Sequence, residues 1–154
     1  MEQLRKMLVK QGIAYTSYTK WSDHFRLKWR HAFASHLSEE EQHAIYMLPT
    51  KKGGHYLWHL FSYEKRPALI GDSAIQAFNE KEKTTCIIFS EMADEVFMLE
   101  NAHELRAELL PERDFYIVDE HFTWSYNHTH EMPYLGPYYT DSKIGGILKN
   151  EHHD

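Results

Sequence analysis

The sequence has little of several features that define common protein classes. Its 154 residues contain a single cysteine, Cys86, which excludes an internal disulfide and lies in the apolar run CIIF, where a core residue is expected. No apolar run approaches the roughly 20 residues that span a bilayer. The start, MEQLRKMLVKQG, lacks the apolar core and cleavage site of a secretory signal. We therefore expect a protein of the cytoplasm that does not contact a membrane.

Positive charge is also scarce. The net charge of −6 argues against a nucleic-acid partner, because such binding depends on Lys and Arg that neutralise phosphates. Residues 1–66 carry 11 Lys and Arg against 6 Asp and Glu (+5), whereas residues 67–154 carry 6 against 17 (−11). This separation of charge can steer a charged partner. Such an asymmetry more often reflects surface charge that only keeps a protein soluble, so it is compatible with a partner that has a basic surface without requiring one.

Motifs that would name an enzyme class are absent. The sequence has no G-x-S-x-G elbow, no G-x-G-x-x-G after a predicted strand and no cysteine with a histidine partner. The segment KKGG at residues 51–54 lacks both the lysine after the glycines and the following helix that a phosphate-binding loop requires. Because no nucleophile is evident, the sequence favours a protein that is not an enzyme, but it leaves the question open.

The hydrophobic pattern predicts one α+β domain over residues 1–154, with N-terminal helices followed by a mostly antiparallel sheet and short helices packed on one face. Apolar residues at every fourth position from Trp21 to Leu37 predict a helix. Ser38 and Glu41 form a capping box for a second helix over residues 39–48. Residues 1–20, which include a short helix over 2–10, and the tail 142–154 are expected to be flexible.

The middle of the chain alternates predicted strands and helices. Strands are expected at residues 55–61, 84–89 and 95–99, and the last two form a hairpin. A short helix is expected after Ser73, which acts as its N-cap with Gln76 completing the box. Another helix is expected over residues 102–110, with Asn101 as its cap and Pro111 at its end.

Aromatic, histidine and carboxylate side chains are concentrated between residues 114 and 139. Residues 115–118 predict a buried strand, and 119–121 predict a hairpin turn. Residues 122–130 alternate with period 2, which predicts an antiparallel partner strand with one aromatic and one polar face. His128 and His130 continue the aromatic face. After this strand, Pro133, Gly136 and Pro137 predict a loop that folds back over the sheet. The loop carries Tyr134, Leu135, Tyr138 and Tyr139.

Several of these segments resemble one known family. The motif FTWSYNHTHE followed by LGPYY, with RPALIGDSAIQAFNEK upstream and the strand DFYIVD between them, is similar to small bacterial proteins, mostly from Gram-positive species, known only as a domain of unknown function. The resemblance covers roughly Trp21 to Tyr139. It implies a soluble, single-domain, cytoplasmic bacterial protein, and it assigns no activity and no residue role.

Two interpretations give the histidines a chemical role. Histidines at i and i+2 of a strand project from one face and can share a metal ion, for which zinc is best suited. Such a site could activate water in a small metal-dependent hydrolase or nuclease. Its candidate ligands are His128, His130, His121, Asp119 and Glu131. The second interpretation is a metal-free pocket in which a histidine beside a carboxylate transfers protons.

The third interpretation, which we favour, is structural or interfacial and needs no cofactor. His128, His130 and Glu131 hydrogen-bond the end of the hairpin, while the aromatic residues pack the loop or present a binding surface to a partner. Tyrosine and tryptophan dominate binding hot spots, and the chain has 10 tyrosines and 4 tryptophans. The acidic C-terminal half would engage a basic protein surface, as immunity proteins and inhibitors of nucleic-acid enzymes do. The candidate binding residues are Trp124, Tyr126, His128, His130, Glu131, Tyr134, Tyr138 and Tyr139.

Overall fold

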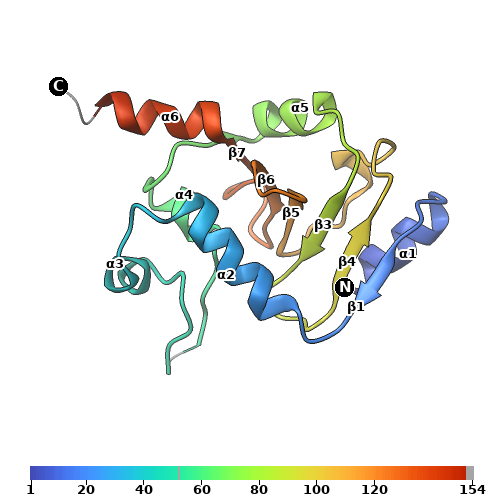
Figure 1. Ribbon diagram of the computed structural model, residues 1–154, viewed down its shortest axis with the longest axis horizontal. Coiled ribbons are helices and arrows are strands. Elements are labelled where there is room, and N and C mark those ends of the chain that lie inside the picture. The colour runs from blue at the N-terminus through green and yellow to red at the C-terminus, as the bar shows by residue number, and fades with distance from the viewer. Residues whose placement is uncertain (52, 152–154) are drawn as a thin grey trace.

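The computed structural model describes residues 1–51 and 53–151. Its strands form one antiparallel sheet in the order β1-β4-β3-β5-β6-β7-β2 (Figure 1). The strands are β1 (Thr16–Tyr18), β2 (Leu69–Ile70), β3 (Cys86–Phe89), β4 (Val96–Leu99), β5 (Phe115–Asp119), β6 (Trp124–His128) and β7 (Tyr138–Asp141). The predicted α+β class is confirmed.

Short helices surround the sheet. They are α1 (Glu2–Lys10), α2 (Ser22–Phe33), α3 (Glu39–Ala44), α4 (His59–Ser62), α5 (Asp72–Glu80), α6 (Ser142–Glu151) and the 3-10 helix η1 (Ala107–Leu109). None of the helices in the described part of the chain is long and apolar enough to cross a membrane.

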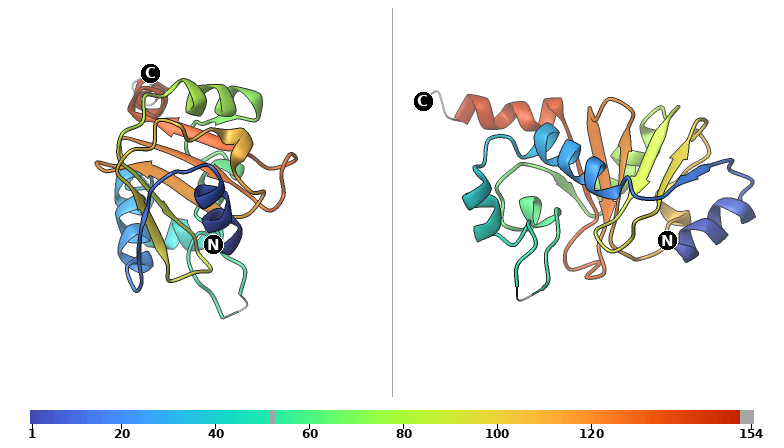
Figure 2. Two further views of the ribbon diagram at one scale, coloured as in Figure 1. Left: turned by 90° about the vertical axis from the view of Figure 1, so that its right-hand side faces the viewer. Right: turned by 60° about the horizontal axis from the view of Figure 1, so that its bottom comes forward.

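Both faces of the sheet are covered, so the molecule has two cores. Residues of α1 and α5, such as Leu8 and Phe78, pack with Tyr126 of β6 on one face. Trp29 of α2 and Phe61 of α4 pack on the other face. The views show α2 crossing one side of the sheet, with α1 and α5 on the other (Figures 1 and 2). The sequence predicted helices on one face of the sheet, whereas the structure has helices on both faces.

This double cover explains why the central strands β3, β5 and β6 are buried along almost their whole length. The predicted hairpin of β5 and β6 is present, with Ile117 opposite Tyr126. The face of β6 that carries the polar residues Ser125 and Asn127 is not exposed, however. Ser125 is buried and its Oγ accepts a hydrogen bond of 2.8 Å from the Trp29 indole N–H, so α2 covers this face with a polar contact.

The predicted N-terminal helices are present, but α3 ends at Ala44 rather than at residue 48. Helix α1 occupies the predicted residues, and the Ser38–Glu41 capping box is formed at the start of α3, with Glu41 N donating to Ser38 Oγ over 3.1 Å. Helix α2 is shorter than the predicted stripe, because it ends at Phe33. Trp21, which precedes it, is 50% exposed, whereas Trp29 and Phe33 are core residues.

Two predicted elements between residues 55 and 110 are wrong. Residues 55–61 form a turn and α4 rather than a strand, because a short apolar run does not distinguish the two. Residues 102–110 form a turn and η1 rather than an α-helix, because tertiary contacts take up the backbone donors. Ala102 N donates to Thr84 O over 2.8 Å, and Ala107 N donates to Asn79 Oδ1 over 2.9 Å.

Three further expectations are corrected. Helix α5 begins at Asp72 after Gly71, whose φ of 67° suits glycine, so Ser73 is not its cap. Tyr138 and Tyr139 belong to β7 rather than to a loop, because residues 138–141 pair with β6. Residues 142–151 of the expected flexible tail form α6, while residues 152–154 of that tail lie outside the described residues.

Candidate functional site

The aromatic face of β6 is a packing surface. Trp124, Tyr126 and His128 share this face and are buried in the core beneath α5. Both ring nitrogens of His128 have partners: Nε2 lies 2.8 Å from Tyr126 Oη, and Nδ1 lies 3.0 Å from Pro111 O. Burial lowers the pKa of His128 and favours the neutral imidazole. His128 therefore ties the end of β6 to the segment before β5.

His130 does not share the face of His128, so the predicted pairing of the two histidines is wrong. Strand β6 ends at His128, and the alternation of faces ends with it. His130 contacts Tyr56 and Trp58, with ring centroids 5.1 and 6.2 Å away. Its Nδ1 lies 2.7 Å from Asp114 Oδ2, and its backbone N–H donates to Asp114 Oδ1 over 3.2 Å.

Of the other candidate metal ligands, Asp119 and His121 make their contacts at the β5–β6 turn, whereas Glu131 lies beside His130. Asp119 accepts hydrogen bonds of 2.6 Å from Thr123 N and Thr123 Oγ1, which close the β5–β6 turn. His121 is exposed beside Glu120, and Glu131 Oε1 lies 3.4 Å from His130 Nε2. Within residues 1–51 and 53–151, no group of three His, Cys, Asp or Glu is placed to hold a metal ion. Zinc binding stays a prediction.

The candidate tyrosines divide between core and surface. Tyr138 packs against Phe61 in the core beneath α2, with ring centroids 5.3 Å apart. Tyr139 points to the opposite core, and its hydroxyl donates to Asp141 Oδ2 over 3.2 Å. Tyr134, in the loop between β6 and β7, is 91% exposed. Of the candidate binding residues, His130, Glu131 and Tyr134 are the ones that reach solvent.

The structure adds a buried acid that sequence reasoning placed in an ordinary hairpin loop. Glu91 Oε1 accepts hydrogen bonds from Leu57 N (2.6 Å) and from the Tyr116 hydroxyl (2.5 Å). Tyr116 Oη accepts in turn from Trp58 N over 2.9 Å. Burial raises the pKa of Glu91 to about 7, and these hydrogen bonds oppose the shift. No sequence signal marks Glu91, because its partners are 34 and 25 residues away.

Trp58 connects this acid to the His130 pair. Its backbone N–H donates to Tyr116, and its indole N–H donates to Asp114 Oδ1 over 2.9 Å. Asp114 therefore accepts from both Trp58 and His130, and its side chain is only 12% exposed. The result is a continuous polar network that runs from the buried Glu91 to the surface at His130.

A chain of aromatic rings extends over the surface from His130. We call it the aromatic strip and define it as His130, Tyr56, His59, Tyr63 and Tyr46. Tyr56 and His59 have ring centroids 5.7 Å apart, His59 and Tyr63 are 5.4 Å apart, and Tyr63 and Tyr46 are 6.3 Å apart. Tyr46 is 50% exposed and Tyr63 is 44% exposed. The high density of Tyr, Trp and His between residues 46 and 63 could have indicated this surface in the sequence. The prediction of a strand in this segment assigned these residues to packing instead.

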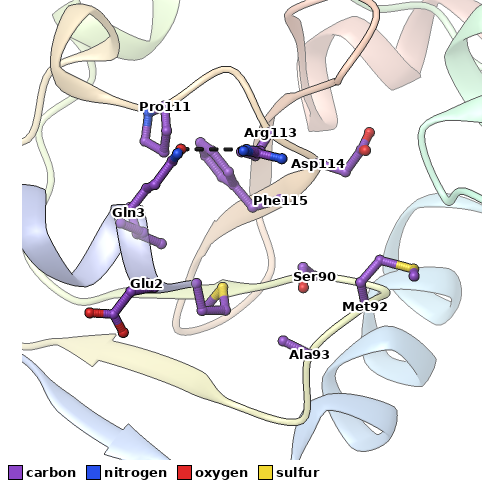
Figure 3. A pocket seen from close by; sticks show the side chains of 11 residues that line it. Glu2, Gln3, Ser90, Met92, Ala93, Pro111, Arg113, Asp114 and Phe115 are labelled. Atoms are coloured by element: carbon purple, nitrogen blue, oxygen red, sulfur yellow. Dashed lines mark hydrogen bonds between the residues drawn. The ribbon is translucent and has the colours of Figure 1, made fainter.

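Two cavities flank the β3–β4 loop. The larger, of about 480 Å³, lies between the start of α1, this loop and the segment before β5 (Figure 3). In Figure 3, Gln3 of α1 meets Arg113 across Phe115, with Arg113 Nε donating to Gln3 Oε1 over 3.4 Å. Asp114 also lines this cavity, but its carboxylate is already occupied by Trp58 and His130. The smaller cavity, of about 230 Å³, lies against α2 on the Glu91 side of the loop.

Comparison with known proteins gives one match. Residues 1–139 match the domain of unknown function DUF4275, which extends the resemblance seen in the sequence to the N-terminus. No curated protein and no solved structure matches the chain. Since the match spans most of the 154 residues, the chain belongs to the DUF4275 family.

Proposed function

We propose that this protein acts in the cytoplasm by binding a protein partner through the aromatic strip together with Glu131 and Tyr134. The observation that carries the proposal is the unbroken run of partly exposed rings from Tyr46 to His130. Rings in such a run have already lost much of their side-chain freedom, because each packs against the next. A partner can therefore bury them at a low cost in conformational entropy.

The charge around the strip supports a basic partner. Glu131 is half exposed beside His130, and the carboxylate of Asp114 lies behind the same ring. Both belong to residues 67–154, which carry 17 acidic against 6 basic residues. Lysine and arginine side chains of a partner can contact the tyrosine faces while they approach these carboxylates. The proposed role is thus that of an immunity-like or inhibitor-like protein that covers a basic surface, and nucleic acid is not the proposed partner.

Site-specific photo-crosslinking in the source cell tests the proposal. A benzophenone amino acid at Tyr63 or at Tyr134 should give the same discrete protein adduct, because both positions border one surface. The matched control is Tyr18 on β1, which is 42% exposed and lies at the opposite end of the sheet order. Adducts that form equally from Tyr18, or no adduct from the two strip positions, would contradict the proposed surface.

The alternative of a zinc-dependent hydrolase or nuclease gains no supporting contact from the described residues. It remains a separate prediction, and metal analysis tests it.

A further inference from the structure

The segment that leads into α4 is tied to the sheet by side chains rather than by strand pairing. Residues 55–58 run as irregular chain into α4 (Figure 1). The backbone N–H of Leu57 donates to Glu91 Oε1 over 2.6 Å, and that of Trp58 donates to Tyr116 Oη over 2.9 Å. The Tyr116 hydroxyl donates in turn to Glu91 Oε1. Glu91, which belongs to the β3–β4 loop, therefore fastens this loop to both the start of α4 and strand β5.

The loop that carries Glu91 has room to move. Residues 90–95 join β3 to β4 between the two cavities of about 480 and about 230 Å³, and Figure 3 shows three of them beside the larger one. Met92, the residue after Glu91, is 80% exposed. The start of the loop is held, because Ser90 O accepts a hydrogen bond of 2.6 Å from Arg26. Glu91 can therefore swing out into water while Ser90 stays in place.

Ionisation changes how well the buried position suits Glu91. Its Oε2 is buried and has no hydrogen-bond partner within residues 1–51 and 53–151. A protonated carboxyl is neutral there, and its Oε1 still accepts from Leu57 and Tyr116. In an ionised carboxyl, Oε2 shares the negative charge, and burial withholds the water that would stabilise this charge. Ionisation therefore favours the arrangement in which the loop has opened and the carboxylate meets water.

The charged groups around Glu91 do not offset this cost. They are Asp114 and Tyr116 on the β5 side, Asp23, Arg26, Arg30 and His55 around the smaller cavity, and Asp94 and Glu95 on the same loop. The negative charge of Asp114 disfavours ionisation of Glu91 further. Arg26 and Arg30 are bonded elsewhere and form no ion pair with Glu91 in the part of the chain that the structure describes. Burial lowers the pKa of His55, which favours its neutral form.

We propose that Glu91 is a pH-sensitive latch that holds the β3–β4 loop against Leu57 and Tyr116 while it carries a proton and lets the loop open more often once the proton is released. Burial raises the pKa of the carboxyl from 4.5 to about 7, so opening releases one proton between these values. Leu57 lies between Tyr56 and His59, and the latch therefore affects how firmly the aromatic strip is held. This consequence for the strip rests on the proposed function, whereas the latch itself does not.

Amide hydrogen exchange of the free protein, followed for each residue by nuclear magnetic resonance, tests the latch. After correction for the intrinsic exchange rate, the protection of the Leu57 amide should fall by about tenfold per pH unit between about pH 5 and about pH 7, because each opening releases one proton. Low concentrations of urea should not speed this exchange, since the opening of a loop exposes little surface. Ile117 in β5 is the internal reference, because its amide should exchange only when the sheet unfolds, which urea promotes.

Glu91→Gln should make the protection of Leu57 independent of pH, because the amide oxygen still accepts from Leu57 N but cannot ionise. The matched control is Asp94→Asn, which removes an exposed carboxylate from the same loop and should keep the wild-type dependence. The amide spectrum of each variant reports whether it is folded, and the wild-type series decides alone if Glu91→Gln does not fold.

Three results would each overturn the latch. The first is a wild-type protection of Leu57 that does not change with pH, and the second is a folded Glu91→Gln variant that keeps the wild-type dependence. The third is an exchange of Leu57 that occurs only together with that of Ile117. Because the free protein is used, these results do not depend on the crosslinking experiment that tests the proposed binding surface.

Discussion

At the scale of single residues, the burial of Glu91 makes the stability of the fold depend on pH. The folded chain raises its pKa from the ordinary value of 4.5 to about 7. Between these values the folded state holds a proton that the unfolded state has released, so the free energy of unfolding falls as pH rises through this window. The cost is about 1.4 kcal/mol per pH unit and therefore about 3 kcal/mol at most.

Glu91→Gln removes this dependence, because the amide cannot ionise while its oxygen still accepts from Leu57 and Tyr116. We expect the stability of the variant relative to the wild type to improve as pH is raised from about 5 to about 8. Urea denaturation at both pH values measures the change. Glu40→Gln on the exposed side of α3 is the control and should show no such trend. If the free energy of unfolding of Glu91→Gln differs from that of the wild type by the same amount at both pH values, the prediction is wrong.

Asp114 illustrates a second cost of burial, that of a donor left without an acceptor. Asp114→Ala removes the oxygen that accepts from the Trp58 indole and both contacts to His130. We expect a loss of about 1–3 kcal/mol in the free energy of unfolding. Asp94→Ala, at an exposed position of the β3–β4 loop, should change it by less than about 0.5 kcal/mol. Equal effects of the two substitutions in chemical denaturation would show that the Asp114 network is not stabilising.

The histidines give a direct test of the zinc interpretation. His128 is bonded to Tyr126 and Pro111, and His130 is paired with Asp114, so neither ring offers a free nitrogen toward the other. We therefore expect elemental analysis of protein purified without chelator to find far less than one zinc per chain. Roughly one zinc per chain, lost in the variant with both His128→Ala and His130→Ala, would instead establish a metal site.

At the scale of elements, several predictions that rest on neighbouring residues are confirmed, whereas the caps predicted at Ser73 and Asn101 are wrong. Helix α1, the α3 capping box and the β5–β6 hairpin depend on spacing within a few residues, and the sequence displays that spacing. Strand β7 was missed because two prolines and a glycine precede it, although β6 supplies its hydrogen-bond partners. Helix α4 and η1 were missed because packing and distant donors or acceptors decide their form.

Two of the three predicted helix caps, at Ser38 and Ser73, provide a matched pair of substitutions. Ser38→Ala removes the side-chain oxygen that accepts from Glu41 N, and it should cost about 1 kcal/mol in the free energy of unfolding. Ser73→Ala replaces an exposed serine inside α5 that makes no cap hydrogen bond, and it should be neutral or slightly stabilising. Thermal or urea unfolding of both variants checks the contrast. A larger loss for Ser73→Ala would mean that the cap assignment at Gly71 is wrong.

At the scale of the whole molecule, the candidate site was only partly predictable. The sequence pointed to His130, Glu131 and Tyr134, which lie together near the end of β6 and in the loop that follows it. Their neighbours in the aromatic strip come from residues 46–63, and nothing in the local pattern brings these two segments together. The buried Glu91 was hidden for the same reason, since its contacts depend on the sheet and on α4 being assembled.

The uneven charge of the two halves predicts how a partner associates. If the acidic C-terminal half steers a basic protein, the association rate constant should fall markedly between about 50 and about 500 mM salt, because mobile ions screen the attraction. Stopped-flow or surface-based kinetics with the crosslinked partner measures this rate. Glu131→Gln should reduce the salt dependence, whereas Glu100→Gln, at the end of β4, should not. An association rate that does not depend on salt would exclude steering.

The edges of the sheet restrict how other chains can attach to it. One edge is β1, with three residues, and the other is β2, with two. A strand of this length exposes too few unpaired backbone groups to template a further strand. Polymerisation through the sheet is therefore disfavoured even when the protein is concentrated. For the same reason, we expect a second chain to contact side chains rather than to continue the backbone ladder.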